Sequence, residues 1–208
     1  LGLLKGSPDS TFHQSSTKTS AIDSTSSGPL NRCIYTSMKK EGVKREEIKK
    51  LICMEQEITN VSSLADLTNL EELYLQNNEL TSLIDFPTLN KLKIISVAGN
   101  KQLTSTQGIE KFPALEEFQA NKSGLTDLKG VEQLAKLKVV GLMMNKIVDV
   151  SAFLHLEHIE NVVLSYNPVT DISAFKNKNA LVWFTAHGTK IRDVSPLIGN
   201  TSLNTVGV

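Results

Sequence analysis

The sequence has no excess of charge of either sign, contains no long apolar run and holds only two cysteines. Its 22 basic residues balance its 22 acidic residues, so no basic field for nucleic acid or for an anionic membrane is expected. Its apolar runs are only a few residues long, which excludes a membrane-spanning helix. The two cysteines leave two alternatives, a pair of buried thiols or a single disulfide bridge.

Sequence motifs of enzymes are also missing. No P-loop, GxGxxG, HExxH, GxSxG or CxxC pattern occurs. His155 and His158 are three residues apart, with Glu157 and Glu160 nearby, but no third metal ligand is evident. We therefore expect no catalytic residue, no metal and no cofactor, and the chain is predicted not to be an enzyme.

A repeated pattern fills most of the chain. Residues 70–83 read LxxLxLxxNxLxxL, and aligning every such unit on its first apolar position gives steps of 22 residues with a single step of 23. The extra residue falls between Asn100 and Leu103, where we expect a one-residue bulge. The repeat domain covers residues 48–208, and its eight units start at Ile48, Leu70, Leu92, Leu115, Leu137, Ile159, Leu181 and Leu203.

Each unit is predicted to form one turn of an α/β solenoid. Its LxL segment alternates inward and outward side chains, as in a short β-strand. No turn can bury its own apolar side, so stacked turns must cover one another and place their strands in a parallel sheet on the concave face. The convex face is expected to hold short 3₁₀ and loop segments. Three of them repeat an Asp-x-Ser pattern that favours turns, at Asp149, Asp171 and Asp193.

A polar residue follows each strand, eight residues after the start of its unit. A short amide at this place can hydrogen-bond backbone groups that lose their sheet partners inside the turn. Four amides are therefore predicted to form a structural ladder: Asn78, Asn100, Asn145 and Asn167. Gln56, Ser123 and Thr189 hold the same place in three other units, and the two shorter side chains predict local irregularity.

The N-terminal part differs in composition from the repeats. Of residues 1–30, 12 are Ser or Thr, which predicts a flexible tether. The alternative is an arm that docks on the domain through apolar residues between Leu1 and Phe12. Residues 31–47 are predicted to form a helical cap over the open first turn, with Asn31 as the N-cap and Gly42 as the left-handed residue after the helix.

The 22-residue unit LxxLxxLxLxxNxIxDIxxL resembles the internalin-type leucine-rich repeat of bacterial surface proteins. The match covers residues 48–208. This resemblance implies a right-handed leucine-rich-repeat coil that binds a protein ligand on its concave sheet and has no catalytic role. The phosphatase-regulating leucine-rich-repeat proteins of eukaryotes have the same repeat length, and they imply the alternative of an intracellular regulatory scaffold.

The two cysteines indicate the cellular compartment in which the protein works. Cys33 lies on the apolar face of the predicted cap helix, and Cys53 takes an inward position of the first strand. A helix laid over the first turn would bring the two cysteines together. The bridge would then add about 3 kcal/mol to the stability of the folded state. A bridge implies an extracytoplasmic place, in the periplasm, at the cell surface or secreted. Bacterial leucine-rich-repeat lipoproteins look similar, with a Cys-bearing cap and a Ser/Thr-rich tether.

Several outward strand positions in the fifth to seventh units are apolar, although they do not build the core. Apolar side chains that cluster at the surface around an aromatic anchor mark a contact surface, and the chain's single tryptophan lies among them. The candidate partner-binding residues are Tyr74, Val139, Met143, Met144, Val163, Tyr166, Trp183 and His187.

The eighth unit reaches Val208 within its strand, and no C-terminal cap is visible. An uncapped end exposes apolar surface and a strand edge. We therefore expect either further residues or another chain to cover it, and self-association through this end is one prediction.

Overall fold

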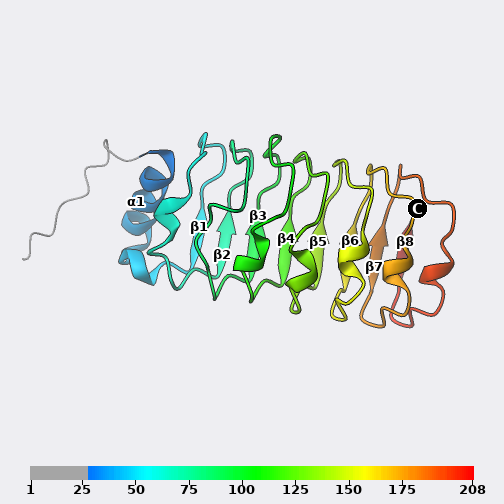
Figure 1. Ribbon diagram of the computed structural model, residues 1–208. Coiled ribbons are helices and arrows are strands. Elements are labelled where there is room, and N and C mark those ends of the chain that lie inside the picture. Colours follow the sequence, from blue (N-terminus) through cyan, green and yellow to red (C-terminus); the bar gives the residue numbers. More distant parts are fainter. Residues whose placement is uncertain (1–27) are drawn as a thin grey trace, which may run out of the picture.

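The computed structural model describes residues 28–208, so most of the predicted tether, and the alternative docking arm, lie outside the described residues. Eight strands form one parallel sheet in chain order (Figure 1). This arrangement confirms the predicted α/β solenoid. The strands are β1 (Lys50–Ile52), β2 (Glu72–Tyr74), β3 (Ile94–Ser96), β4 (Glu117–Gln119), β5 (Val139–Gly141), β6 (Asn161–Val163), β7 (Trp183–Thr185) and β8 (Thr205–Gly207).

The strand register reproduces the sequence repeat. Leu51 on β1 pairs with Leu73 on β2, 22 residues later, and Leu73 pairs with Ile95 on β3. The step from Ile95 to Phe118 on β4 is 23 residues, which matches the single long unit. Residues at the same place in successive units therefore lie side by side across the sheet.

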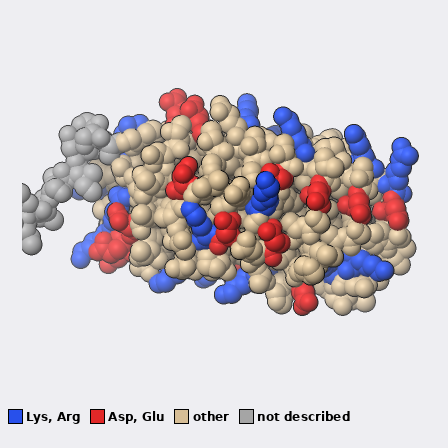
Figure 2. Space-filling model, viewed as in Figure 1, with Lys and Arg blue, Asp and Glu red and all other residues tan. Residues whose placement is uncertain are grey.

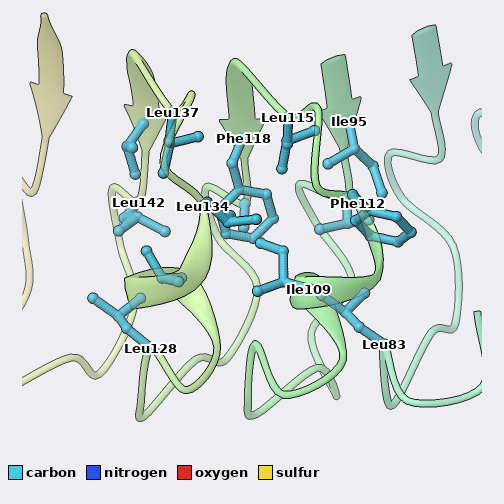
Figure 3. Close-up of a cluster of buried hydrophobic side chains, with 14 of the residues drawn as sticks. Leu83, Ile95, Ile109, Phe112, Leu115, Phe118, Leu128, Leu134, Leu137 and Leu142 are labelled. Atoms are coloured by element: carbon cyan, nitrogen blue, oxygen red, sulfur yellow. The ribbon is translucent and has the colours of Figure 1, made fainter. Parts of the chain in front are cut away.

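One hydrophobic core runs along the whole solenoid, between the strands and the convex side. Figure 3 shows Ile95 and Phe118 pointing from their strands toward Ile109 and Phe112 of the convex segments. Phe112 also packs edge-on against Phe86 of the preceding turn, with ring centroids 5.6 Å apart. Because neighbouring turns supply each other's cover, truncating one of these phenylalanines to Ala is expected to cost about 3–5 kcal/mol.

The four ladder asparagines are buried where the chain leaves the sheet. Asn145 shows their common pattern. Its Nδ2 donates to the carbonyl oxygens of Ala120 at 2.8 Å and Leu142 at 2.9 Å, and its Oδ1 accepts the N–H of Leu125 at 3.1 Å. Each such amide therefore joins its own turn to the preceding one and satisfies backbone groups that water cannot reach.

Ser123 takes the place of an asparagine in the fourth turn, and the sheet register continues through it. The extra residue of the preceding turn explains why an amide is not needed. It lets the N–H of Leu103 bond to the carbonyl of Asn100 at 2.9 Å, so that group requires no acceptor from the next turn. Ser123 then has only to donate its hydroxyl to the carbonyl of Val97, at 3.2 Å.

The convex side carries short 3₁₀ helices, as predicted. In the later turns an aspartate sets the start of the helix: the Oδ1 of Asp149 accepts the N–H of Ser151 at 2.8 Å, and that of Asp171 accepts the N–H of Ser173 at 2.7 Å. This bond fixes the turn that leads into the helix. The convex helices are η2 (Ser62–Leu64), η3 (Ile109–Lys111), η4 (Val131–Gln133), η5 (Ser151–Phe153), η6 (Ser173–Phe175) and η7 (Ser195–Leu197).

A single α-helix, α1 (Pro29–Glu41), lies against the first turn in the described part of the chain (Figure 1). The prediction of Asn31 as its N-cap is wrong, because Gly28 is the N-cap and Pro29 starts the helix. Proline suits a first helical position, since its φ is already helical and its missing N–H has no partner there. Gly42 ends the helix in the left-handed conformation, as predicted, with φ 68°.

The cap is attached to the first turn by packing and by a covalent bond. Leu30 and Ile34 of α1 are buried in the core, and the 3₁₀ helix η1 (Arg45–Glu47) leads into β1. Cys33 and Cys53 form a disulfide with their Cα atoms 5.8 Å apart, which confirms the predicted bridge. Among residues 28–208, no helix combines the length and the apolar character needed to cross a membrane.

Candidate functional site

The outward face of the sheet places several predicted partner-binding residues on neighbouring strands. The register pairs Val139 on β5 with Asn161 on β6, and Asn161 with Trp183 on β7, so these three side chains share one row. Val163 stands in the next row, beside Gly141 on one strand. The side chain of Gln119 lies over this glycine, where its Oε1 would collide with an added Cβ.

The side chains differ in exposure. Trp183 is 45% exposed, Met144 is 45% exposed and Tyr166 is 55% exposed. Val139, Met143 and Val163 are partly buried. We refer to these residues of the fifth to seventh turns as the apolar patch: Val139, Met143, Met144, Val163, Tyr166 and Trp183.

Met144 and Tyr166 occupy an unusual backbone position. Each is the eighth residue of its turn and has a positive φ, 58° and 61° respectively. The equivalent residues of the other turns are Glu55, Asn77, Gly99, Lys122 and Gly188, of which glycine and asparagine adopt this conformation easily. A bulky apolar residue there costs about 1–2 kcal/mol of strain. Sequence reasoning missed this constraint, although the aligned glycines and asparagine were a usable signal.

Tyr166 and His187 both lean toward the C-terminal end of the solenoid. The N–H of Tyr166 donates to the carbonyl of His187 at 2.7 Å. The ring of Tyr166 covers Gly188, where an added Cβ would lie 2.7 Å from its Cδ1 atom. The imidazole of His187 covers Gly207 in the same way, with Nε2 2.5 Å from such a Cβ. His187 therefore borders the apolar patch, next to the turn that carries Tyr166.

Tyr74 is separate from the apolar patch, because it lies on β2 and the patch begins at β5. Its hydroxyl donates to Glu72 at 3.0 Å, and the ammonium of Lys50 stands 5.0 Å from its ring centroid. Lys50 and Glu72 also form an ion pair at 2.7 Å. Burial raises the pKa of Tyr74, and the bond from Lys50 lowers the pKa of Glu72. The structure thus gives Tyr74 a polar, internally paired environment.

Alternating charges line the edge of the sheet where the strands begin. Lys93 donates to Glu71 at 2.7 Å, Lys49 stands 3.7 Å from the same carboxylate, and Lys138 donates to Glu116 at 2.9 Å. These bonds lower the pKa values of Glu71 and Glu116. Sequence reasoning missed this charge ladder, although the charge of the second residue alternates in sign through the first six units.

The hollows found on the described surface are shallow and open to solvent. One hollow of about 400 Å³ lies between α1 and β1 and is lined by Arg32, Lys50, Ile52 and other residues. His155 and His158 are exposed on the convex side. In the part of the chain that the structure describes, no group of three His, Cys, Asp or Glu side chains is arranged to hold a metal ion.

Comparisons with known proteins agree with this architecture. A family model described as "Leucine Rich repeats (2 copies)" matches residues 68–111. No curated protein matches the chain by sequence. Among solved structures, internalin C2 from Listeria monocytogenes is 17% identical, with a TM-score of 0.63, and the match covers 86% of this chain and 96% of that one.

Two further bacterial structures show the same fold. An internalin (inlF) from Listeria monocytogenes is 18% identical, with a TM-score of 0.52, over 86% of this chain and 81% of that chain. A leucine-rich-repeat protein from Leptospira interrogans is 16% identical, with a TM-score of 0.72, over 86% of this chain and 45% of that chain. The chain is therefore a leucine-rich-repeat solenoid whose fold is similar to that of the internalins.

Proposed function

We propose that the chain is a non-enzymatic protein-recognition module that binds a partner protein through the apolar patch. The observation that carries this proposal is the residue choice at the left-handed positions of the fifth and sixth turns. Met144 and Tyr166 expose large apolar side chains there, where glycine or asparagine would be less strained. Polar side chains, Glu55 and Lys122, hold the same strained position in the first and fourth turns, so among the first seven turns only the fifth and sixth expose a large apolar side chain there. An apolar side chain kept at an exposed and strained position supports a binding role.

Trp183 supplies the anchor of the proposed interface. Tryptophan and tyrosine are enriched among residues that dominate binding energy, because a large ring removes much area from water and loses little rotamer entropy. Both side chains are about half exposed and lie in adjacent turns. His187 borders them and can supply a hydrogen bond at the rim, whereas Tyr74 would belong to the contact only if the partner extended to the second turn.

We further propose that the module works outside the cytoplasm, in the periplasm, at the cell surface or as a secreted protein of a bacterium. The disulfide between Cys33 and Cys53 supports an oxidising compartment. It argues against the alternative of an intracellular scaffold of the phosphatase-regulating type. A lipoprotein-like anchor at the N-terminal side of the cap would fit the Ser/Thr-rich composition of residues 1–30.

An affinity capture experiment tests the protein-binding proposal. The full chain serves as bait, together with a Trp183→Ala variant and an Ile52→Ala control. Ile52 is also an exposed apolar residue of the concave face, 51% exposed, but lies on β1 outside the apolar patch. We expect one protein to be captured by the wild type and the Ile52→Ala variant and to be lost with Trp183→Ala. Equal capture by all three, with folding verified by circular dichroism, would mean that the captured protein does not bind through the apolar patch.

A further inference from the structure

The edge where the strands end carries charges that are separated by sign. We define this exit edge as the eighth to twelfth residues of each of the first seven turns. In the first two turns it holds acidic residues and no basic one: Glu55, Glu57 and Glu79. From the third to the seventh turn it holds no acidic residue, and every one of these turns except the sixth holds a basic residue: Lys101, Lys122, Lys146, Lys190 and Arg192. Figure 2 shows this division along the upper edge, with acidic side chains over the β1 end and basic ones over the rest.

The basic part of the exit edge is free to meet a partner. All five of its cations are exposed, and within residues 28–208 none lies within ion-pair distance of a carboxylate. The aspartates that follow on the convex side, such as Asp149 and Asp171, are engaged with the helix starts. On the opposite edge, the lysines of the charge ladder form ion pairs with glutamates, whereas the cations of the exit edge form none among the described residues.

The apolar patch and the basic part of the exit edge are continuous. Met144 and Tyr166 belong to both, because each is an eighth residue of its turn. Lys146 follows Met144 by two residues, and the N–H of Lys190 bonds to Val169 of the sixth turn at 2.9 Å. A partner that covers the exposed ring of Tyr166 therefore also comes within reach of two ammonium groups, which favours negative charge on that partner.

We propose that the partner of this site is a protein that presents an acidic segment, with apolar side chains interleaved, to the exit edge of turns three to seven. This inference rests on the proposed function and adds the chemistry of the partner. The strand spacing gives the basic part a length of about 20 Å, which suits an extended segment of about six residues. The acidic first two turns repel such a segment and so fix where it lies along the solenoid.

Two other occupants fit the charges less well. In a two-fold pair of copies joined along the exit edge and centred on the fourth turn, the acidic first turn would face the basic seventh. However, Lys101 would then face Lys146, and Lys122 would face its own copy, so like charges would meet at the centre. A uniform polyanion would gain from the basic part but would be repelled by Glu57 and Glu79, and it would leave Met144 without an apolar contact.

Selection from a random peptide library displayed on phage tests the inference, with the immobilised full chain as target at about 0.05 M salt. We expect the enriched peptides to carry an excess of Asp and Glu beside at least one apolar residue. A variant with Lys101→Glu, Lys146→Glu and Lys190→Glu should bind those peptides about tenfold more weakly or worse, mainly through slower association. The matched reversal, Glu57→Lys with Glu79→Lys, should leave their binding undiminished. All of these residues are exposed, so folding is preserved.

The outcomes separate this inference from the proposed function. Peptides without an acidic excess that still require Trp183 would overturn the inference and leave the proposed function standing. Acidic peptides that bind Trp183→Ala and Tyr166→Gly variants as well as the wild type would overturn both. Tighter binding of heparin or single-stranded DNA than of any peptide would assign the exit edge to polyanions. A dimer in sedimentation that the lysine reversals abolish would assign it to a second copy. Absence of any enrichment would also reject the proposal.

Discussion

The ring of Tyr166 lies against the backbone of Gly188 in the next turn, so closely that a methyl group on Gly188 would meet the ring at 2.7 Å. Gly188 itself has a φ of 65°. This glycine thus has two roles: it adopts a left-handed backbone conformation, and it leaves space for the aromatic ring. The contact connects the scaffold with the apolar patch, because the glycine that shapes the turn also sets the position of an exposed partner-binding candidate.

Replacing Gly188 by Ala should therefore both destabilise the fold and displace Tyr166. We expect a loss of about 1–2 kcal/mol from the backbone alone, with the clash added to it. Gly199→Ala is the control for the backbone part, because Gly199 has φ 99° but nothing within 4 Å of an added Cβ. Urea unfolding measures both. Equal losses for the two variants would mean that the ring moves aside without cost.

Tyr166→Gly should separate binding from stability. Glycine relieves the strain at φ 61°, while the loss of the ring removes its contact with Gly188. These effects oppose each other, so the free energy of unfolding should change by less than about 1 kcal/mol. Binding of the partner, or of peptides selected on the wild type, should fall at least tenfold, since an aromatic anchor of an interface contributes about 2 kcal/mol or more.

Glu55→Gly is the matched control for that variant. Glu55 is also the eighth residue of its turn, with φ 57°, but it lies in the first turn, far from the apolar patch. It should gain stability in urea unfolding and keep full binding, as measured by surface plasmon resonance. If Tyr166→Gly kept full binding as well, Tyr166 would be part of the scaffold only.

Asn145→Ala should be among the most damaging single changes outside the apolar core. It removes hydrogen bonds of 2.8, 2.9 and 3.1 Å and leaves the carbonyl of Ala120 and the N–H of Leu125 in the fourth turn without partners. The carbonyl of Leu142 keeps its bond from Asn167 at 2.7 Å. Each unsatisfied buried group costs about 1–3 kcal/mol, so a total loss of about 3 kcal/mol or more is expected in urea unfolding. Asn121→Ala is the control, because its partly buried amide accepts the N–H of Met143 on the open face. A loss under about 1 kcal/mol for Asn145→Ala would show that water can replace its amide.

The parts of this protein that the sequence predicts well are those that burial dictates. Leu73 and Asn78 recur because an inward strand position must be apolar and a buried turn must satisfy its backbone. The pairing of Cys33 with Cys53 was also predictable, since a capping helix has only one end of the solenoid to cover. These features depend on a residue's place in its own turn, which the 22-residue period reveals.

Features that depend on the neighbouring turn were harder to predict. The strain at Tyr166 and the bonds of the charge ladder require knowledge of φ and of side-chain direction. Lys178 is a further case. It takes a place where the preceding turn has the buried Leu156, and its ammonium donates to the carbonyl of Leu154 at 2.7 Å. Burial lowers the pKa of Lys178. The 22-residue pattern describes an average turn, so it does not reveal a single residue that departs from that average.

The charge ladder gives a stability contribution with a defined pH dependence. The pKa values of Glu71 and Glu116 are lowered in the folded protein, chiefly by hydrogen bonds from Lys93 and Lys138. A lowered carboxyl pKa stabilises the fold fully above the unfolded value of about 4.3, and the contribution is lost as the pH falls through the lower folded value.

Glu116→Gln should therefore reduce the free energy of unfolding at pH 7 and have no effect at pH 2. Because both partners are partly exposed to solvent, with side-chain exposures of 37% for Glu116 and 42% for Lys138, the loss at pH 7 should be below about 1 kcal/mol, and 1 M salt should diminish it. Urea unfolding at the two pH values and two salt concentrations measures the difference. Glu132→Gln is the control, since Glu132 is exposed on the convex side and forms none of the ion pairs found among the described residues. A loss of equal size at pH 2 would mean that Glu116 acts through packing, because its carboxyl group is then uncharged.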